Sequence, residues 1–254
     1  MRIVSLCLTL YVLSMSSLYA EDTKPLLKAC SHLGFEPYVI QNGQHLSGID
    51  IDIIQETLKD NQLSFELSAL PWARLIEALK NGDCDIGFSL FDRHNRRAYA
   101  SYIFDVPIHT SNIRVFSLKE HDLHFEKVTD LYGLNIAYNR GFSFTYELEF
   151  GVEARKIHRY PYDHPESALK MLKAGRIDLI LGNEQRINYY LKKLGWTDTV
   201  VSQSIPFMSH EPAFLVISKE SRFNENNLHS RLKKSLLKMK KSGRISEINQ
   251  KYRP

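Results

Sequence analysis

The chain has 254 residues, enough for one large domain or for two small ones that each bury their own core. Apolar residues make up 43% and charged residues 24%, which is typical of a soluble globular protein and not of a disordered chain. The formal net charge of +4 is too small to indicate nucleic acid as a partner.

Residues 1–20 have the pattern of a secretory signal peptide. Arg2 provides the basic start, an apolar core runs from Ile3 to Leu13, and a polar stretch ends at Ala20, near which we expect cleavage. The apolar core is too short to span a bilayer comfortably, and no other stretch is apolar enough to cross one. We therefore expect an exported protein.

Two cysteines, Cys30 and Cys84, remain after export, in a compartment where disulfide bonds persist. Each opens or lies within an apolar run typical of a strand, and neighbouring parallel strands would bring the two together. The sequence leaves open whether they form a disulfide bond or remain two buried free thiols.

The first part of the chain alternates between strand and helix patterns. The expected strands are 25–33, 63–67 and 86–90. The expected helices are one that residues 46–54 lead into and that ends at about 60, one from 71 to 82, and one that a polar turn at 92–100 opens. This β-α-β-α-β-α order indicates a parallel sheet with helical crossovers.

A second series of the same kind follows. Its expected strands are 135–138, 157–160, 179–181 and 213–218, and its expected helices begin in 144–150 and cover 165–174, 185–194, 227–241 and 245–252. No Pro/Gly/Ser-rich linker separates the two series. We therefore expect extended strands near 109–115 and 210–216 to connect two lobes.

One short motif occurs twice. Residues 79–86 read LKNGDCDI, and residues 172–179 read LKAGRIDL. In each copy an amphipathic helix ends at a Lys and a Gly, and an Asp then leads into a short apolar strand. Two such units predict two α/β lobes.

Ligands of open α/β sheets bind at the carboxyl ends of the strands. Two facing lobes would form a cleft lined by the turn at 89–97, with Ser89, Arg96 and Arg97, and by the turn at 139–143, with Phe142 and Ser143. Guanidinium groups at a helix start, together with a hydroxyl and free backbone N–H groups, suit a carboxylate. By spacing alone, Arg96 and Arg97 fit two surface charges equally well.

Several motifs follow one another along the chain: GIDID at 48–52, PWAR at 71–74, NGDCD at 81–85, DLYG at 130–133, RGFS at 140–143, GRID at 175–178 and MKKSGRI at 239–245. Their order and spacing resemble the periplasmic solute-binding proteins of family 3, the polar amino-acid type. The resemblance covers essentially all of the mature chain. It implies a two-lobed α/β fold of the type II periplasmic binding protein kind, in which each lobe is a mostly parallel sheet flanked by helices. Residues 21–110 with 212–254 would form lobe 1, residues 111–211 would form lobe 2, and two hinge strands would join them.

The resemblance also implies a function. A periplasmic protein of this kind captures a small carboxylate-bearing ligand, an amino acid or a related compound, and presents it to the inner-membrane permease of an ABC-type importer. We expect a monomer that binds no cofactor, metal or nucleic acid and is not an enzyme, since the sequence has no zinc, phosphate-loop or nucleophile-elbow motif.

Individual residues can be carried over from the family. The Arg that takes the ligand carboxylate falls on Arg96, on the expectation that Tyr99 and Tyr102 then share its helix face, and Arg97 is the alternative. Ser143 matches the hydroxyl position of the second lobe. Aromatic rings that face the cleft match Phe35, Tyr38 and Trp72, although Trp72 also fits an ordinary core residue.

One position departs from the family pattern. Asn183 stands where the family has the acidic residue that takes the ligand ammonium. A neutral amide cannot offset the desolvation of a buried ammonium as a carboxylate can. Either Glu184 substitutes for it, or the ligand is not an ordinary α-amino acid.

Two other functions occur on the same fold. Periplasmic dehydratases of cyclic dicarboxylates need an acid in the cleft, and Glu36 or Glu184 is a candidate for it. Sensing lobes of signalling receptors are the other alternative, which we disfavour because no spanning helix or signalling module follows Pro254.

Overall fold

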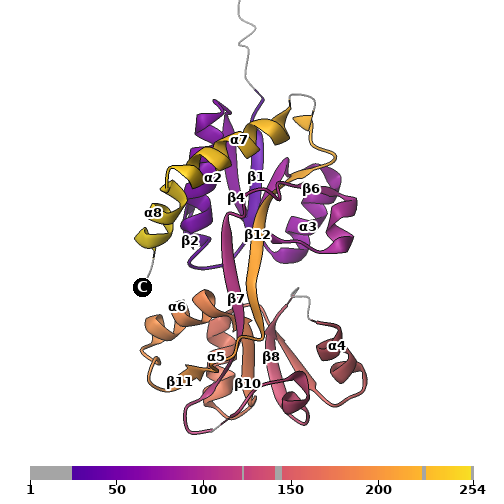
Figure 1. Ribbon diagram of the computed structural model, residues 1–254, viewed down its shortest axis with the longest axis vertical. Coiled ribbons are helices and arrows are strands. Elements are labelled where there is room, and N and C mark those ends of the chain that lie inside the picture. Colours follow the sequence, from indigo (N-terminus) through magenta and orange to yellow (C-terminus); the bar gives the residue numbers. More distant parts are fainter. Residues whose placement is uncertain (1–24, 122, 141–144, 225–226, 253–254) are drawn as a thin grey trace, which may run out of the picture.

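The computed structural model describes residues 25–121, 123–140, 145–224 and 227–252, which form two lobes joined by two long strands (Figure 1). The signal peptide expected at residues 1–20 lies outside this range. Among the described helices, none combines the length and apolar character that a bilayer span requires.

Lobe 1 is built on a parallel sheet in which β1 lies between β4 and β5. The chain returns to this lobe for its last two helices, which pack against α2 (Figure 1). The elements of lobe 1 are β1 (Leu27–His32), β2 (Ile40–Asn42), β3 (His45–Ser47), α2 (Ile49–Asp60), β4 (Phe65–Leu70), α3 (Trp72–Asn81), β5 (Ile86–Phe91), the 3-10 helix η1 (His94–Ala98), β6 (Ala100–Tyr102), α7 (Leu228–Lys241) and α8 (Arg244–Lys251).

Lobe 2 repeats the plan with β8 between β9 and β10, again in parallel. Its elements are the 3-10 helix η2 (Val128–Leu131), β8 (Asn135–Asn139), α4 (Tyr146–Glu153), β9 (His158–Tyr162), α5 (Pro165–Lys173), β10 (Leu179–Asn183), α6 (Glu184–Leu194) and β11 (Val200–Ser202).

The two connecting strands are β7 (His109–Leu118) and β12 (Met208–Ser218), which run antiparallel and side by side between the lobes (Figure 1). Toward lobe 1, β12 pairs with β5, and toward lobe 2, β7 pairs with β10. The register of the β7–β12 pair shifts between Met208 and Glu211, where His210 has a φ of 56°. Two paired strands with an irregular ladder are a place where the molecule can bend.

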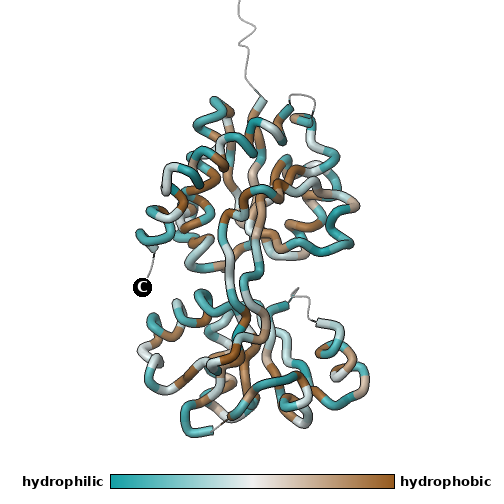
Figure 2. Tube along the Cα trace, viewed as in Figure 1, coloured by the Kyte–Doolittle hydropathy of each residue, from teal (hydrophilic) through white to brown (hydrophobic). Residues whose placement is uncertain are grey.

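Each lobe has apolar cores on both faces of its sheet. In lobe 1, one core lies under α2, α7 and α8 and the other under α3, and lobe 2 has the same arrangement around α5 and α6 and around α4. Figure 2 shows the apolar segments gathered inside each lobe. Every residue of β10, and all of β5 except its last, is buried. These strands read as continuous apolar runs because both faces are covered.

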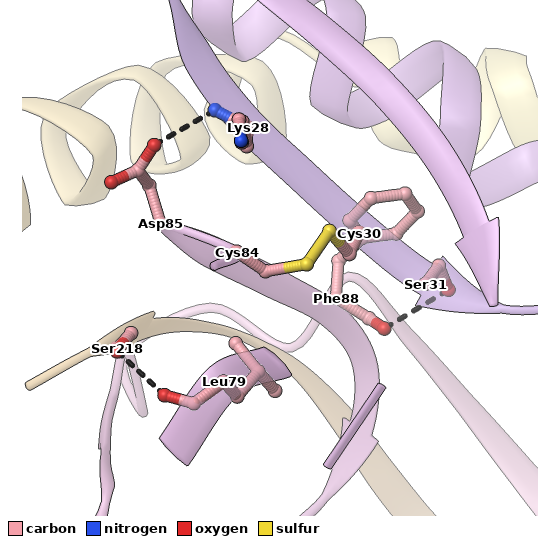
Figure 3. The surroundings of a disulfide bond; sticks show 8 residues. All are labelled: Lys28, Cys30, Ser31, Leu79, Cys84, Asp85, Phe88 and Ser218. Atoms are coloured by element: carbon pink, nitrogen blue, oxygen red, sulfur yellow. Dashed lines mark hydrogen bonds between the residues drawn. A yellow bond between two sulfur atoms is a disulfide. The ribbon is translucent and has the colours of Figure 1, made fainter. Parts of the chain in front are cut away.

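Cys30 in β1 and Cys84, just before β5, form a disulfide bond with a Cα–Cα distance of 6.0 Å (Figure 3). The neighbouring Asp85 accepts the backbone N–H of Lys28 at 2.9 Å and donates its own N–H to the Lys28 carbonyl. The disulfide and these hydrogen bonds together hold the start of β5 beside β1.

The turn at 92–100 differs from the expectation of a helix. It contains only η1, a single 3-10 turn, after which β6 pairs with β12. Residues 94–98 read HNRRA and offer no apolar face to bury. The expected helix face shared by Arg96, Tyr99 and Tyr102 therefore does not exist, because Tyr102 lies on a strand.

Candidate functional site

A cavity lies between the lobes, where β1 and β5 of lobe 1 meet β8 and β10 of lobe 2. Its volume is about 50 Å³, and a single water needs roughly 10–15 Å³ by this measure. It has room for a few waters or a small compound, so a larger ligand requires the lobes to part. The described lining residues are His32, Phe35, Trp72, Ser89, Phe91, Arg93, Arg96, Ile113, Asn139, Arg140, Tyr162, Leu181, Gly182, Asn183 and Arg186.

Arg96 is the buried cation of the lobe 1 wall. Its guanidinium carbon lies 4.7 Å from the centre of the Trp72 ring, and its Nη1 donates to the carbonyl of Phe91 at 2.8 Å. Only 8% of the residue is exposed, and burial lowers the pKa of its guanidinium. Arginine nevertheless stays protonated in proteins. No described acidic side chain forms an ion pair with Arg96, so its charge is available to a ligand.

Arg97, the alternative to Arg96, does not line the cavity. Its side chain is 54% exposed and pairs with Asp92, to which its Nε donates at 2.9 Å. The hydrogen bond to Asp92 raises the pKa of the Arg97 guanidinium and lowers the pKa of the Asp92 carboxyl. Arg96 and Arg97 are adjacent in sequence, yet only Arg96 reaches the cavity.

Asn183 lines the lobe 2 wall at the start of α6. Its side-chain oxygen accepts the backbone N–H of Arg186 at 3.0 Å and thereby caps the helix. Its Nδ2 is buried and has no hydrogen-bond partner among the described residues. The side-chain atom of Asn183 without a hydrogen bond is therefore a donor, and the Asn183 side chain also lies near enough to the buried Tyr38 hydroxyl to act on its pKa.

Arg186 is a lining residue that the sequence reasoning missed. Its exposure is 2%, and its Nη2 donates across the cleft to the carbonyl of Gly34 in lobe 1 and to the carbonyl of Asp163 at 3.1 Å. With the Asn139 amide oriented to satisfy both of its polar atoms, the Asn139 oxygen accepts from Nη1 at 2.7 Å. The Nε of Arg186 is buried without a partner in the described structure. The available signal was its spacing, because Arg186 lies on the same α6 face as buried Tyr190.

Phe35, Trp72 and Ser89, three of the residues expected at the cleft, also line this cavity. Ser89 has a left-handed backbone, with a φ of 65°, inside β5. Its hydroxyl donates to Asp50 at 2.6 Å and accepts from the Ser31 hydroxyl at 3.0 Å. These hydrogen bonds hold a backbone conformation that is uncommon for a residue with a side chain.

Tyr38 is not among the described residues that line this cavity, and it lines instead a second, larger hollow bordered by α6 of lobe 2. It is 2% exposed and stacks on His109 with 3.7 Å between the ring centres. His109, the first residue of β7, is also hydrogen-bonded through its Nδ1 to Asp50 at 2.9 Å. Burial, followed by the charge of Asp50, raises the pKa of the Tyr38 hydroxyl, and the nearby Asn183 side chain partly opposes this rise. Tyr38 thus belongs to the support of the connecting strand. The expected residues Phe142 and Ser143 lie outside the described residues.

The charge of the lining is one-sided. The described lining residues include four arginines and His32 and no Asp or Glu. Arg93 pairs with Glu211 at 3.3 Å and Arg140 with Asp163 at 2.9 Å, whereas Arg96 and Arg186 have no described ion-pair partner. Burial and the charge of Arg186 lower the pKa of His32 to about 4, so this ring is neutral at pH 7. The described residues contain no group of His, Cys, Asp and Glu that could hold a metal ion.

The model of the bacterial extracellular solute-binding proteins, family 3, matches residues 27–254. The chain belongs to this family. Its relatives include the probable amino-acid-binding protein YxeM of Bacillus subtilis (strain 168), which is 21% identical over 217 residues, covering 85% of this chain and 79% of the relative. The proteins of this family are extracellular or periplasmic solute-binding proteins.

Two solved structures share the two-lobed fold. An ancestral arginine-binding protein bound to arginine is 20% identical, with a TM-score of 0.76 over 90% of this chain and 98% of that one. The ancestral amino acid-binding protein AncCDT-1, a precursor of cyclohexadienyl dehydratase, is also 20% identical, with a TM-score of 0.72 over 89% and 94% of the two chains. At this level of identity the likeness concerns the fold.

Proposed function

We propose that this protein captures a small carboxylate-bearing ligand in the cavity between its lobes. The observation that carries the proposal is Arg96, a buried guanidinium that stacks on Trp72 and has no acidic partner among the described residues. A buried charge is costly unless it is paired, and a carboxylate can accept two parallel hydrogen bonds from one guanidinium. A ligand carboxylate would therefore complete the site.

Capture would proceed by hinge closure. Lobe 2 connects to the rest of the chain through β7 and β12, whose ladder is irregular between the lobes. Several contacts cross the cleft in the closed arrangement, among them Arg186 to the Gly34 carbonyl and the Tyr190 hydroxyl to Glu36 at 3.1 Å. Opening would break these contacts and expose the cavity, and a bound acid would favour closure by contacting both walls.

The cellular role follows from the family. We propose that the protein is exported by the segment at 1–20, acts as a monomer in the periplasm and delivers its ligand to the permease of an ABC-type importer. Family membership and the predicted signal peptide support this proposal.

We propose binding rather than catalysis. The fold neighbour AncCDT-1 is named as a precursor of a dehydratase, and such a reaction here would need an acid facing the cavity. The two candidates are engaged elsewhere in the described structure, Glu36 with Tyr190 and Glu184 with Arg114 and Asn112. Incubating each bound compound with the protein should return it unchanged in mass spectrometry, and a dehydrated product would reject this proposal.

The arginine pair tests the proposed binding site. A thermal-shift screen of amino acids and small mono- and dicarboxylates supplies the ligand, and calorimetry measures its affinity. Arg96→Ala should weaken binding by roughly 2–5 kcal/mol, because it removes one side of a buried charge pair. Arg97→Ala, the matched exposed control, should bind like the parent protein. Equal affinity in Arg96→Ala would reject the site.

A further inference from the structure

The lobe 2 wall presents donors at the position where an amino-acid ammonium needs acceptors. Asn183 uses its only side-chain oxygen to cap α6, so its Nδ2 is the atom left over. Arg186 is 2% exposed, and its Nε is the second donor without a described partner. An ammonium group is itself only a donor. It would meet two donors and a positive charge.

Glu36, whose charge acts on Arg186, accepts the Tyr190 hydroxyl at 3.1 Å and is not among the described residues that line the cavity. Glu184 and Asp163 do not correct this polarity either. Both oxygens of Glu184 are occupied, one by Arg114 and the other by Asn112 at 2.8 Å. Asp163 pairs with Arg140 at 2.9 Å. Neither acid is among the described residues that line the cavity. Glu184 therefore does not take the place of the missing acid in this structure.

Two buried cations remain, one on each wall. Arg96 projects from lobe 1 and Arg186 from lobe 2, and neither has a described ion-pair partner. Each guanidinium lies over an aromatic ring, with Arg96 4.7 Å from the centre of Trp72 and Arg186 5.8 Å from the centre of Phe35. Two guanidinium groups in a mostly apolar cavity are best neutralised by a ligand with two negative groups.

We propose that the ligand is a small diacid that has no ammonium group, and this inference rests on the proposed function. One carboxylate binds Arg96, and the other accepts hydrogen bonds from Asn183 Nδ2 and Arg186 Nε. Hydroxy and keto substituents are tolerated between the two acids because they can accept hydrogen bonds from these donors.

Matched ligand pairs that differ at the amine test the inference directly. Calorimetry with the full mature protein compares L-malate with L-aspartate and 2-oxoglutarate with L-glutamate, with pyruvate as a monoacid. We expect at least one diacid to bind at least tenfold more tightly than its amino counterpart and than pyruvate.

A single substitution should reverse the preference. Asn183→Asp keeps the helix cap, since Asp caps as well as Asn, and it places a carboxylate in the lobe 2 wall. We expect it to weaken diacid binding at least tenfold and to bring the amino counterpart to equal or greater affinity. Asn183→Ser is the matched control, because it keeps the cap, removes the donor and adds no charge. It should lose diacid affinity severalfold without gaining the amino acid.

The outcomes separate this inference from the proposed function. Tighter binding of an amino acid or of pyruvate by the parent protein, lost in Arg96→Ala, would overturn the diacid inference and leave the binding function standing. Unchanged selectivity in Asn183→Asp would also overturn it. No binding of any of these compounds, or of any compound in the screen, would reject both.

Discussion

The two lobes contain the same helix-to-strand turn, yet the structure supports each copy differently. Gly82 and Gly175 both adopt a left-handed backbone, with φ values of 76° and 64°. Asp85 and Asp178 then make equivalent hydrogen bonds, each accepting a backbone N–H from the neighbouring strand and donating its own N–H to the same residue there. The repeated sequence motif therefore corresponds to a repeated hydrogen-bonding unit.

The surroundings of the two turns differ. Asp85 is 3% exposed and also accepts from the buried Ser221 hydroxyl at 2.8 Å, while Asp178 is half-buried and also accepts from the Asn135 side-chain amide at 2.9 Å. Cys84 carries the disulfide bond, and its counterpart in lobe 2 is Ile177, which is held by apolar packing. The turn of lobe 1 is thus reinforced by a disulfide bond, where the turn of lobe 2 has only hydrogen bonds and apolar packing.

The disulfide bond should account for the largest difference between the lobes. Replacing Cys30 with Ala and Cys84 with Val, an approximation of the Ile177 arrangement, opens a covalent loop with a sequence separation of 54. The loss of this constraint on the unfolded chain should lower the free energy of unfolding by about 4 kcal/mol. Urea denaturation followed by circular dichroism measures it. A loss below about 1 kcal/mol would contradict the assigned reinforcement.

The paired aspartates give the next largest effect. Asp85→Ala leaves a backbone N–H and a buried hydroxyl without their acceptor and should cost about 3 kcal/mol, whereas the half-buried Asp178→Ala should cost about half as much. Ser221→Ala isolates the buried hydroxyl bond of Asp85 and should account for about 1 kcal/mol. Equal losses for the two aspartates, measured by the same denaturation, would show that burial does not distinguish the turns.

The third effect concerns the glycines of the two turns, Gly82 and Gly175. A Cβ on Gly82 would lie 2.7 Å from the backbone oxygen of Glu220, whereas a Cβ on Gly175 meets nothing within 4 Å. Both alanine variants carry the left-handed backbone penalty of about 1 kcal/mol, and Gly82→Ala should reach about 2 kcal/mol because the backbone must also shift. Melting temperatures in parallel calorimetric scans rank the two, and a larger loss at Gly175 would contradict the packing seen around Gly82.

The smallest effect concerns pH and the strand ends that face the cavity. His32 in lobe 1 and Asn139 in lobe 2 lie at equivalent places, four positions after Lys28 and Asn135, and only His32 titrates. Its folded pKa of about 4 lies below the unfolded value of 6.5, so the unfolded chain takes up the proton first as the pH falls. The folding stability linked to the neutral His32 ring is therefore fully present above pH 6.5 and is lost as the pH falls toward 4.

The corresponding experiment compares the parent protein with His32→Asn. Between pH 7 and pH 5.5 the parent should lose about 1 kcal/mol more than the variant, by proton linkage at this one site. Urea denaturation at the two pH values measures the difference. Parallel losses in both proteins would show that His32 is not desolvated in the closed cleft.

Much of the fold could be predicted from the sequence because its signals are local. The amphipathic helices, the buried strands and the Gly turns depend on spacing within a few residues, and the extended stretches near 109 and 210 are indeed the connecting strands β7 and β12. The turn at 92–100 could not be predicted in this way. Its end pairs with β12 more than a hundred residues later, so a distant partner decides its structure.

The site was harder to predict from the sequence, because its contacts also join residues that are far apart in the chain. Arg96 lines the cavity although the helix face used to favour it does not exist, and its role stays a prediction. Tyr38 stacks on His109 at the start of β7, a residue distant in sequence. Arg186 donates to Gly34 of lobe 1 and to Asp163 of lobe 2, contacts that no local pattern records.

The way the chain passes through the lobes has a practical consequence. Both β1 and α8, the first and last described elements, belong to lobe 1, whereas lobe 2 is entered by β7 and left by β12 (Figure 1). Lobe 2 is therefore one contiguous segment of the chain, with two junctions to lobe 1. Exchanging that segment for the one of a relative would replace the Asn183 wall in one step, and a surface tether attached beside α8 would leave lobe 2 untethered.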